Sequence, residues 1–205
     1  MARNVPIPTG SIFLLASLLL IGGCRAPVPD VQPGLDLNFA DLGPIPLKVA
    51  HIDVVEDYAP TRTPPHVELQ FAVPPDQAIR RWIADRLRAA AGDADLTIDI
   101  TEADIVEDKL PVEGGLRGAV IDQQNRQWTA HLAATLSLRS IATGRLIATT
   151  GFHIEHLRTT PQSATTGDVR EAQAELIREA MADFDHMATL TLHQDMPQIL
   201  LQPEP

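Results

Sequence analysis

The clearest pattern of hydrophobic and polar positions lies between Trp128 and Leu138. Every second residue of this segment is apolar, and the residues between them, including His131, are polar or small. A period of two places alternate side chains on opposite faces of a β-strand. The segment therefore predicts a strand with one face in the core. The turn signal Ala142-Thr143-Gly144 predicts a hairpin, with a returning strand that passes through Ile154.

Three other segments carry strand patterns. Residues 96–100 alternate aliphatic side chains with polar ones, and residues 67–73 do the same, so each predicts a strand with one buried face. Residues 47–55 are rich in aliphatic and β-branched side chains on both faces, which predicts a strand buried on both sides. Pro60, Pro64 and Pro65 separate the strand predicted at 47–55 from the one at 67–73, and Pro74-Pro75 ends the latter.

Two segments carry apolar residues at the spacing of an amphipathic helix. The first is predicted to begin near Pro75 and to stop at Gly92, and Trp82 lies in its apolar stripe, which favours a core position over a ligand platform. The second is predicted to begin at a capping-box pattern of Asp168 and Glu171 and to reach about residue 193. Its stripe consists of Val169, Gln173, Leu176, Ala180, Phe184, Met187 and Ala188.

The predicted order of elements is β-β-α-β-β-β-α. Strands with one apolar face and helices with one apolar stripe bury that surface when the helices pack on one face of a sheet. We therefore expect an α+β fold, a two-layer sandwich with a mainly antiparallel sheet of about four to five strands and two helices on one face. The globular domain is predicted to cover residues 47–196, and residues 197–205 are predicted to form a flexible tail.

The N-terminal segment has the pattern of an export signal. Arg3 supplies positive charge, and an apolar run of about ten residues follows, too short for a helical membrane span of about 20 residues. The sequence Leu20-Ile21-Gly22-Gly23-Cys24 resembles the lipobox of bacterial lipoproteins. Residues 1–23 are therefore predicted to be a lipoprotein signal peptide, with Cys24, the only cysteine, as the lipidated residue. An ordinary cleaved signal beside a chance cysteine is the alternative.

Residues 24–46 are predicted to form a tether between the lipid and the domain. Five prolines fall within it, and proline at this density favours an extended, semi-rigid spacer. Its apolar residues Leu35, Leu37 and Phe39 could alternatively dock on the domain or on a partner. Arg25 stands where an aspartate marks inner-membrane retention in enteric bacteria, so we expect the protein at the outer membrane, facing the periplasm.

Composition narrows the classes of partner. The formal net charge is −11, whereas a nucleic-acid interface needs a basic stripe, so no nucleic acid is expected as a partner. Aromatic residues make up 4% of the chain, which argues against an aromatic platform for sugars or bases. A single cysteine excludes an internal disulfide.

No pattern of catalytic or metal-binding residues emerges. The segment His153-Ile154-Glu155-His156 invites a metal interpretation, but an odd separation on a strand points its two histidines to opposite faces. No serine lies in a G-x-S-x-G motif, and the glycine-rich segment 114–118 lacks the lysine and hydroxyl of a phosphate-binding loop. We therefore expect no enzyme activity, no metal and no cofactor. A run of carboxylates is interpreted as a solvated edge, and it comprises Glu102, Asp104, Glu107, Asp108 and Glu113.

The connection between Lys109 and Arg126 is longer than most loops in compact domains. Exposed aliphatic side chains in such a loop favour contact with a partner protein. A hairpin extension folded onto the domain's own edge is the alternative. The candidate partner-contact residues are Leu110, Val112, Leu116, Val120 and Ile121.

The organisation of the chain resembles that of a known class of envelope protein. Lipobox, proline-rich tether, amphipathic helix at 79–90, three strands and a long C-terminal helix resemble the auxiliary lipoproteins of ABC-type envelope transport systems. The small lipopolysaccharide-assembly lipoproteins are similar. The resemblance covers residues 47–193, and the Tyr-x-Leu segment usual after the tether in the first family is absent, so no site residues are carried over.

The resemblance implies a non-catalytic, membrane-anchored partner protein in an envelope transport or assembly system. Its partner would be a transporter or an outer-membrane protein. A lipid- or glycan-binding carrier is the first alternative, and a hydrolase of envelope polymers is the least favoured one.

Overall fold

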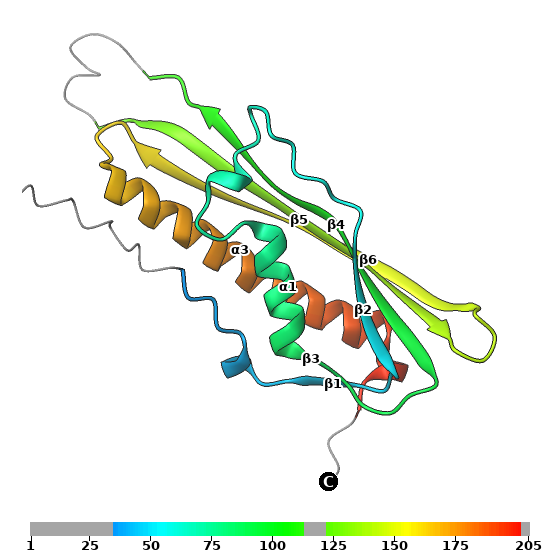
Figure 1. Ribbon diagram of the computed structural model, residues 1–205. Coiled ribbons are helices and arrows are strands. Elements are labelled where there is room, and N and C mark those ends of the chain that lie inside the picture. The colour runs from blue at the N-terminus through cyan, green and yellow to red at the C-terminus, as the bar shows by residue number, and fades with distance from the viewer. Residues whose placement is uncertain (1–34, 113–121, 202–205) are drawn as a thin grey trace, which may run out of the picture. The chain divides into compact units, whose positions relative to one another are not determined.

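The computed structural model describes residues 35–112 and 122–201, drawn as coloured ribbon in Figure 1. Within this described part, no helix is long and apolar enough to cross a membrane. Its helices are α1 (Pro75–Arg86), α3 (Thr166–Asp195) and the short 3-10 helices η1 (Ala40–Leu42), η2 (Glu68–Gln70) and η3 (Pro197–Ile199). Its strands are β1 (Ile45–Leu47), β2 (His51–Glu56), β3 (Leu87–Ala89), β4 (Ala94–Lys109), β5 (Gln124–Ser140) and β6 (Leu146–Pro161).

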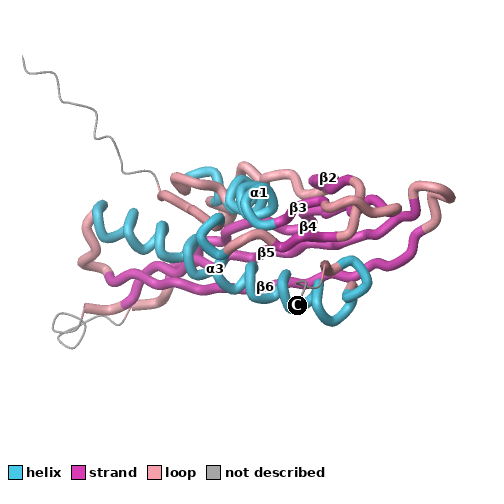
Figure 2. The backbone as a smooth tube through the Cα atoms, turned by 90° about the horizontal axis from the view of Figure 1, so that it is seen from below, coloured by secondary structure: helices cyan, strands magenta, loops and turns pink. Residues whose placement is uncertain are grey.

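A four-stranded sheet runs in the order β2-β4-β5-β6, in which β2 is parallel to β4 and the other neighbours are antiparallel. A second sheet consists of β1 and β3, paired in parallel. Both α-helices pack on one face of the larger sheet, α1 on β4 and α3 mainly on β6 and β5 (Figures 1 and 2). The α+β fold expected from the sequence, a mainly antiparallel sheet with two helices on one face, is confirmed.

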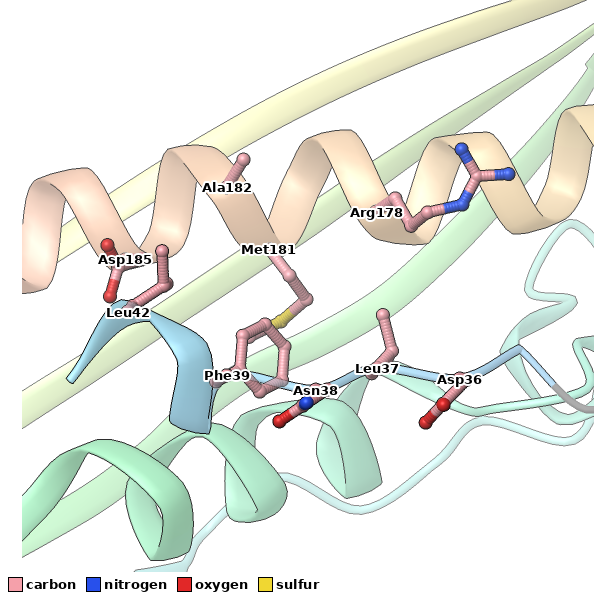
Figure 3. Close-up of a pocket in the computed structure, with 9 residues that line it drawn as sticks. All are labelled: Asp36, Leu37, Asn38, Phe39, Leu42, Arg178, Met181, Ala182 and Asp185. Carbon is pink, nitrogen blue, oxygen red and sulfur yellow. The ribbon is translucent and has the colours of Figure 1, made fainter. Parts of the chain in front are cut away.

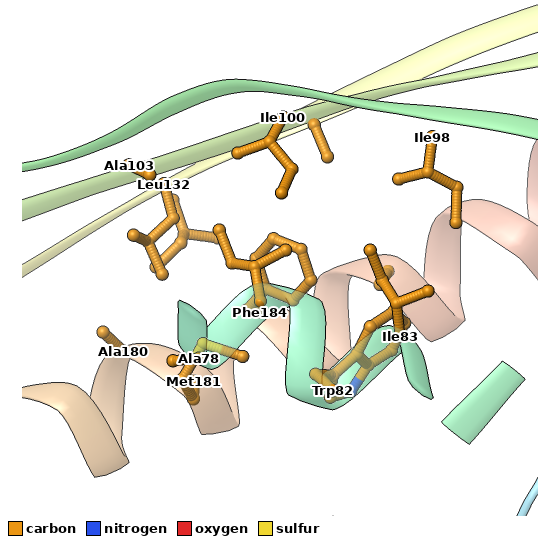
Figure 4. Close-up of a cluster of buried hydrophobic side chains, with 14 of the residues drawn as sticks. Ala78, Trp82, Ile83, Ile98, Ile100, Ala103, Leu132, Ala180, Met181 and Phe184 are labelled. Atoms are coloured by element: carbon orange, nitrogen blue, oxygen red, sulfur yellow. The ribbon is translucent and has the colours of Figure 1, made fainter. Parts of the chain in front are cut away.

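β5 supplies the centre of the core because the predicted alternation holds along it. Its even-numbered residues from Trp128 to Leu138 are each 3% exposed or less. Figure 4 shows Leu132 in the layer between sheet and helices, on the same side as Phe184. Trp82 occupies this layer too, with its ring centroid 5.2 Å from that of Phe184, so its predicted place in the core is confirmed. Burial of each large apolar side chain contributes roughly 1.5–3 kcal/mol.

β4 extends well beyond the strand predicted at residues 96–100. Its register with β5 shifts between Ile100 and Glu102, where Thr101 is the extra residue of a β-bulge. Before the bulge the even-numbered residues face the helices, and after it the odd-numbered residues do so. This switch interrupts the period of two in the sequence, and for that reason the second half of the strand was not predicted. Of the carboxylates interpreted as a solvated edge, Glu102 and Asp108 are exposed, Asp104 and Glu107 are half-buried, and Glu113 lies outside the described residues.

The strand predicted at residues 67–73 is wrong. His66 forms an isolated bridge to β4, and η2 follows in place of a strand. Val67 and Phe71 are buried, and the ring of Phe71 lies edge-on to that of Trp128. The alternating apolar residues therefore close one end of the core from an irregular segment. Prolines on both sides keep a regular strand from forming there.

The strand predicted at residues 47–55, with both faces buried, is also wrong. The segment divides into β1 and β2, and β2 is an edge strand whose side chains alternate between exposed and half-buried. Leu47 and Val49, at the division, are each 0% exposed. The continuous apolar run therefore marks the passage of the chain from one sheet to the other.

α1 ends at Arg86, well before the stop predicted at Gly92. Residues 87–89 leave the helix and form β3 beside β1. Gly92 is needed for a different reason, since a Cβ at this position would lie 2.3 Å from the backbone oxygen of Lys48. The glycine permits a close approach between two backbone segments instead of capping the helix.

The capping box of α3 lies three residues before the predicted one at Asp168 and Glu171. The N-cap is Thr165, whose hydroxyl accepts a hydrogen bond from the backbone N–H of Asp168. The Asp168 carboxylate in turn accepts one from the backbone N–H of Thr165. This backbone hydrogen bond, with the Thr165 hydroxyl, holds the pKa of Asp168 below its ordinary value because it stabilises the carboxylate.

Both ends of the described chain pack on the domain. Leu37 is 4% and Phe39 7% exposed, so the alternative in which these residues of the predicted tether dock on the domain holds for both. In the predicted tail, Ile199 is 3% exposed, and its carbonyl oxygen accepts a hydrogen bond of 2.6 Å from the N–H of Lys48. Apolar side chains thus draw both terminal segments onto the core.

Replacing Gly92 with alanine should lower the free energy of unfolding by about 1–3 kcal/mol, the usual cost of overpacking, because the new methyl group overlaps Lys48. Urea unfolding followed by circular dichroism measures the change. The control is Gly167→Ala near the start of α3, where the nearest atom to a new Cβ lies at 3.5 Å and alanine should be neutral or stabilising. Equal stability of Gly92→Ala and the wild-type protein would contradict the close approach.

Candidate functional site

The site residues predicted from the sequence fall largely outside the described part of the chain. Cys24 and the lipobox residues Leu20, Ile21, Gly22 and Gly23 lie outside it, and so do Leu116, Val120 and Ile121 of the candidate partner loop. Of that loop, the N–H of Leu110 donates to the carbonyl oxygen of Asn125 at 2.9 Å, which continues the β4–β5 pairing. The side chain of Val112 is 45% exposed.

The N-terminal segment of the described chain, residues 35–47, is called the strap. It passes beside α3 and α1, and Figure 3 shows Phe39 next to Met181 of α3. Leu37 and Phe39 are its buried anchors, and the backbone N–H of Phe39 donates to the Asp85 carboxylate at 3.4 Å. The strap is thus held on the helices by apolar burial and by its own backbone.

A buried ion pair fastens the strap to both helices. Arg86 of α1 is 7% exposed, and its Nε donates to Oδ1 of Asp185 on α3 at 2.9 Å. The same oxygen accepts a hydrogen bond of 2.7 Å from Nε1 of Trp82. Nη1 of Arg86 donates to the carbonyl oxygens of Leu42, at 2.8 Å, and of Gly43. One guanidinium group therefore joins α1, α3 and the strap.

A hollow of about 300 Å³ lies between the strap and α3 (Figure 3). Phe39 and Met181 contribute to its apolar wall, whereas Arg178 and Asp36 stand at one end of it. Most of the lining residues are exposed, so the hollow is a groove on the surface and not an enclosed cavity. Its lining consists of Asp36, Leu37, Asn38, Phe39, Leu42, Arg178, Met181, Ala182 and Asp185.

The face of the four-stranded sheet opposite the helices is called the open face. Its side chains alternate along each strand with those that point to the core. Among the described residues its basic group is Arg139, and carboxylates outnumber it. These carboxylates are Asp53, Asp95, Asp99, Glu102, Asp104, Asp108 and Glu155.

Histidines and carboxylates pair across the open face. A carboxylate oxygen of Asp104 lies 3.3 Å from Nδ1 of His131 and 3.4 Å from Nδ1 of His66. Nδ1 of His153 lies 2.9 Å from Glu102, and the rings of His153 and His131 stack with centroids 6.3 Å apart. Over residues 35–112 and 122–201, no group of three or more His, Cys, Asp or Glu side chains is placed to hold a metal ion. Glu102 and Asp104 of β4 are therefore paired with histidines of other segments.

On the helix side of β6, carboxylates of α3 meet basic side chains of the strand. The residues Glu175, Glu179 and Asp183, spaced by one helical turn each, are called the carboxylate ladder. His156 of β6 lies 3.1 Å from Glu179 and 2.8 Å from Asp183. Arg158 pairs with Glu175 and, at 3.1 Å, with Glu179. These contacts fix α3 along β6.

The two histidines of the segment 153–156 point to opposite faces of the sheet, as their odd separation predicts. His153 contacts Glu102 on the open face, whereas His156 contacts the carboxylate ladder on the helix side. They therefore do not converge on a common ligand.

A buried carboxylate lies where η2 closes the core. Glu68 is 1% exposed, and its Oε1 accepts a hydrogen bond of 2.9 Å from the hydroxyl of Tyr58. Burial raises the pKa of Tyr58 above its ordinary value of 10.0, and the hydrogen bond to Glu68 and the negative charges of Glu68, Asp104 and Asp76 raise it further. The tyrosine therefore remains a protonated donor through the neutral and mildly alkaline range.

Neither the ion pair of Arg86 and Asp185 nor the pair of Tyr58 and Glu68 was predicted from the sequence. One signal for the first was present, because Arg86 lies four residues after Trp82, on the apolar side of α1. A charged residue within an apolar stripe indicates a buried, paired charge. Its partner could not be read from the sequence, since Asp185 is 99 residues away.

Arg86→Ala should lower the free energy of unfolding by about 3–5 kcal/mol, because it leaves Asp185 without its cation and frees the strap carbonyls. Urea unfolding measures the loss, and limited proteolysis should show faster cleavage near Leu37. Arg88→Ala is the matched control, since Arg88 is exposed and its removal should change stability by about 0.5 kcal/mol or less. Equal losses in the two variants would show that Arg86 does not hold the strap.

Tyr58→Phe should make the stability less sensitive to alkaline pH. The raised pKa means that the folded protein keeps a proton that the unfolded chain releases, so the stabilisation is complete below about pH 10 and declines as the pH rises above that value. Urea unfolding between pH 8 and 11 measures the difference between wild-type and variant proteins. A constant difference across this range would contradict the assignment to Tyr58.

No family model matches the chain, and no curated protein matches it. Solved structures with some similarity include a minor lipoprotein from Acinetobacter baumannii, with 14% identity, coverage of 75% of this chain and 96% of that one, and a TM-score of 0.36. Another is the rare lipoprotein B from Shewanella oneidensis, with 12% identity, coverage of 70% and 97%, and a TM-score of 0.35. At these identities and TM-scores the likeness carries no argument about the function of this chain.

Proposed function

We propose that the protein is a non-catalytic lipoprotein that serves as an interaction component of an envelope transport or assembly system. It is anchored through lipid on Cys24, faces the periplasm and resides at the outer membrane. Its partner is a transporter or an outer-membrane protein.

The lipid anchor is supported by the lipobox Leu20-Ile21-Gly22-Gly23-Cys24. Small residues before the cysteine let the chain enter a signal peptidase site, and the thiol is the nucleophile that accepts the diacylglyceryl group. Each buried methylene contributes about 0.8 kcal/mol, so two or three acyl chains hold the protein stably in a bilayer.

The observation that carries the proposal is the attachment of the strap to the helix layer through Arg86. Because the strap packs on the domain from Leu35 onward, the ten residues 25–34 separate the domain from Cys24, and a chain of this length spans about 33–36 Å at most. A lipid on Cys24 would therefore keep the domain close to the membrane. The open face and the border of the sheet remain for a partner within the same envelope layer.

A lipid-binding carrier is the second candidate, and the groove between the strap and α3 favours it. Its volume of about 300 Å³ lies at the lower end of the range for small-molecule sites, and its wall includes Leu37, Phe39 and Met181. It ranks second because most of its lining is exposed, so a bound acyl chain would keep much of its contact with water.

Cys24→Ala should abolish the incorporation of a labelled fatty acid into the protein in cells, because the variant has no thiol to acylate. The label is followed by gel electrophoresis of the immunoprecipitated full-length protein. The control is Ser17→Ala in the apolar run, which leaves the lipobox intact and should be labelled as well as the wild type. Label retained by Cys24→Ala, or absent from the wild-type protein, would refute the anchor.

A further inference from the structure

β6 has a free edge. The strand covers Leu146–Pro161 and pairs with β5 on one side, and the described residues place no strand or bridge on its other side. In an antiparallel edge strand every second N–H and C=O points away from its partner strand. A row of backbone donors and acceptors therefore lines this border of the sheet, beside α3 (Figures 1 and 2).

The opposite border of the sheet is shorter and divided, because its edge strand β2 has only 6 residues and a different segment follows it along β4. β2 pairs with the first part of β4, from Asp95 to Ile100. Tyr58 donates its N–H to the carbonyl oxygen of Ile100, and residues 65–67 hydrogen-bond to β4 around Val106. The described chain thus covers the edge of β4 along most of its length while that of β6 is left free.

Between Ala148 and Thr160 the free edge has no proline and no β-bulge, two features that often keep a strand from pairing with another chain, and its inward-pointing charges are His156 and Arg158. Residues 146–160 contain no proline and no lysine, and the register with β5 is continuous from Ala148 to Thr160. Its 16 residues far exceed the usual strand length of about 5–6. The continuous part from Ala148 to Thr160, which has neither bulge nor proline, is suited to accept an additional strand.

The carboxylate ladder gives this border its charge. The side chains of Glu175, Glu179 and Asp183 are 29%, 45% and 54% exposed. The ladder faces Arg158 and His156, so its three carboxylates exceed the fixed positive charge on the strand. The ladder occupies the side of α3 that meets β6, while Met181 and Asp185 on the other side meet the strap.

We propose that the free edge of β6 accepts an extended strand of the envelope partner, with lysine or arginine at the alternate positions that face the carboxylate ladder. The inference rests on the proposed function, because it names the surface that binds the partner. Backbone hydrogen bonds along β6 hold the added strand, and the period of two places every second side chain beside α3. A second copy of this chain is disfavoured, since it would bring an identical carboxylate ladder against the first.

The test uses the lipidated full-length protein in detergent micelles and two synthetic ten-residue peptides. One peptide alternates valine with lysine, and the other alternates valine with glutamate. Hydrogen exchange read by mass spectrometry should show that only the lysine peptide protects the exchanging amides of β6. No protection by either peptide, or equal protection by both, would overturn the proposal. Protection that rises with protein concentration without any peptide would assign the edge to a second copy and overturn it as well.

Charge-neutral variants test the role of the ladder. The double variant Glu179→Gln with Asp183→Asn should raise the Kd of the lysine peptide about threefold to tenfold, as expected for the loss of two exposed ion pairs. Glu171→Gln removes a carboxylate from the exposed residues of the same helix and should leave the Kd unchanged. Circular dichroism checks that each variant is folded. An unchanged Kd in the folded double variant would rule out the ladder as the determinant of charge preference.

Photo-crosslinking in cells separates this inference from the proposed function. A photoreactive amino acid is placed at Leu157 in β6 or at Leu69 in η2, which are both 48% exposed. We expect Leu157 to capture a partner peptide with alternating lysine or arginine, and Leu69 to capture none. Capture of an envelope protein at Leu69 alone would overturn the inference while leaving the proposed function standing. If neither Leu157 nor Leu69 captures a protein, and chemical crosslinking in native membranes also joins the protein to no envelope protein, both the inference and the proposed function would be overturned.

Discussion

The carboxylate of Asp185 is the point on which the helix layer and the strap both depend. It accepts hydrogen bonds from Arg86 and from Trp82, and Arg86 in turn reaches the carbonyl oxygens of Leu42 and Gly43. A guanidinium group out of water is stable only where its charge and its donors are matched. Here that requirement can be met only when α1, α3 and the strap are in place together.

This dependence links the fold to the proposed attachment at the membrane. A strap held only by Leu37 and Phe39 could dissociate at the cost of exposing two side chains, whereas its release from Arg86 also removes the two carbonyl acceptors of Nη1. The border formed by β6 lies on the side of α3 away from the strap. A partner strand can therefore bind at β6 while the strap stays attached to α3.

The sequence predicts those parts of the fold in which one period persists without interruption. The alternation from Trp128 to Leu138 identified β5 and its buried face, and the two apolar stripes identified both helices. Prediction was wrong where a single residue changes the period, as at the bulge of Thr101, or where apolar residues are buried without a regular element, as in η2. At such positions tertiary packing determines the backbone conformation, so the local pattern of apolar residues cannot predict it.

The candidate site residues also divide into those that a local motif predicts and those that only the fold brings together. A lipobox is a local motif, and its prediction at Cys24 needs no fold, but the structure describes none of its residues. The contacts of Arg86 and the free edge of β6 depend on which distant segments meet and on which strand ends the sheet, so no local pattern could have predicted them. The connection between Lys109 and Arg126 was singled out for its length, and residues 113–121 of it lie outside the described part of the chain.

The most direct test of the account is chemical crosslinking of the wild-type protein in native membranes, followed by mass spectrometry of the crosslinked peptides. The account predicts that the lipidated protein is joined to a transporter or an outer-membrane protein, through peptides that include β6 or the carboxylate ladder of α3. Recovery of the lipidated protein crosslinked to no other envelope protein, at an expression level that matches the native one, would contradict it.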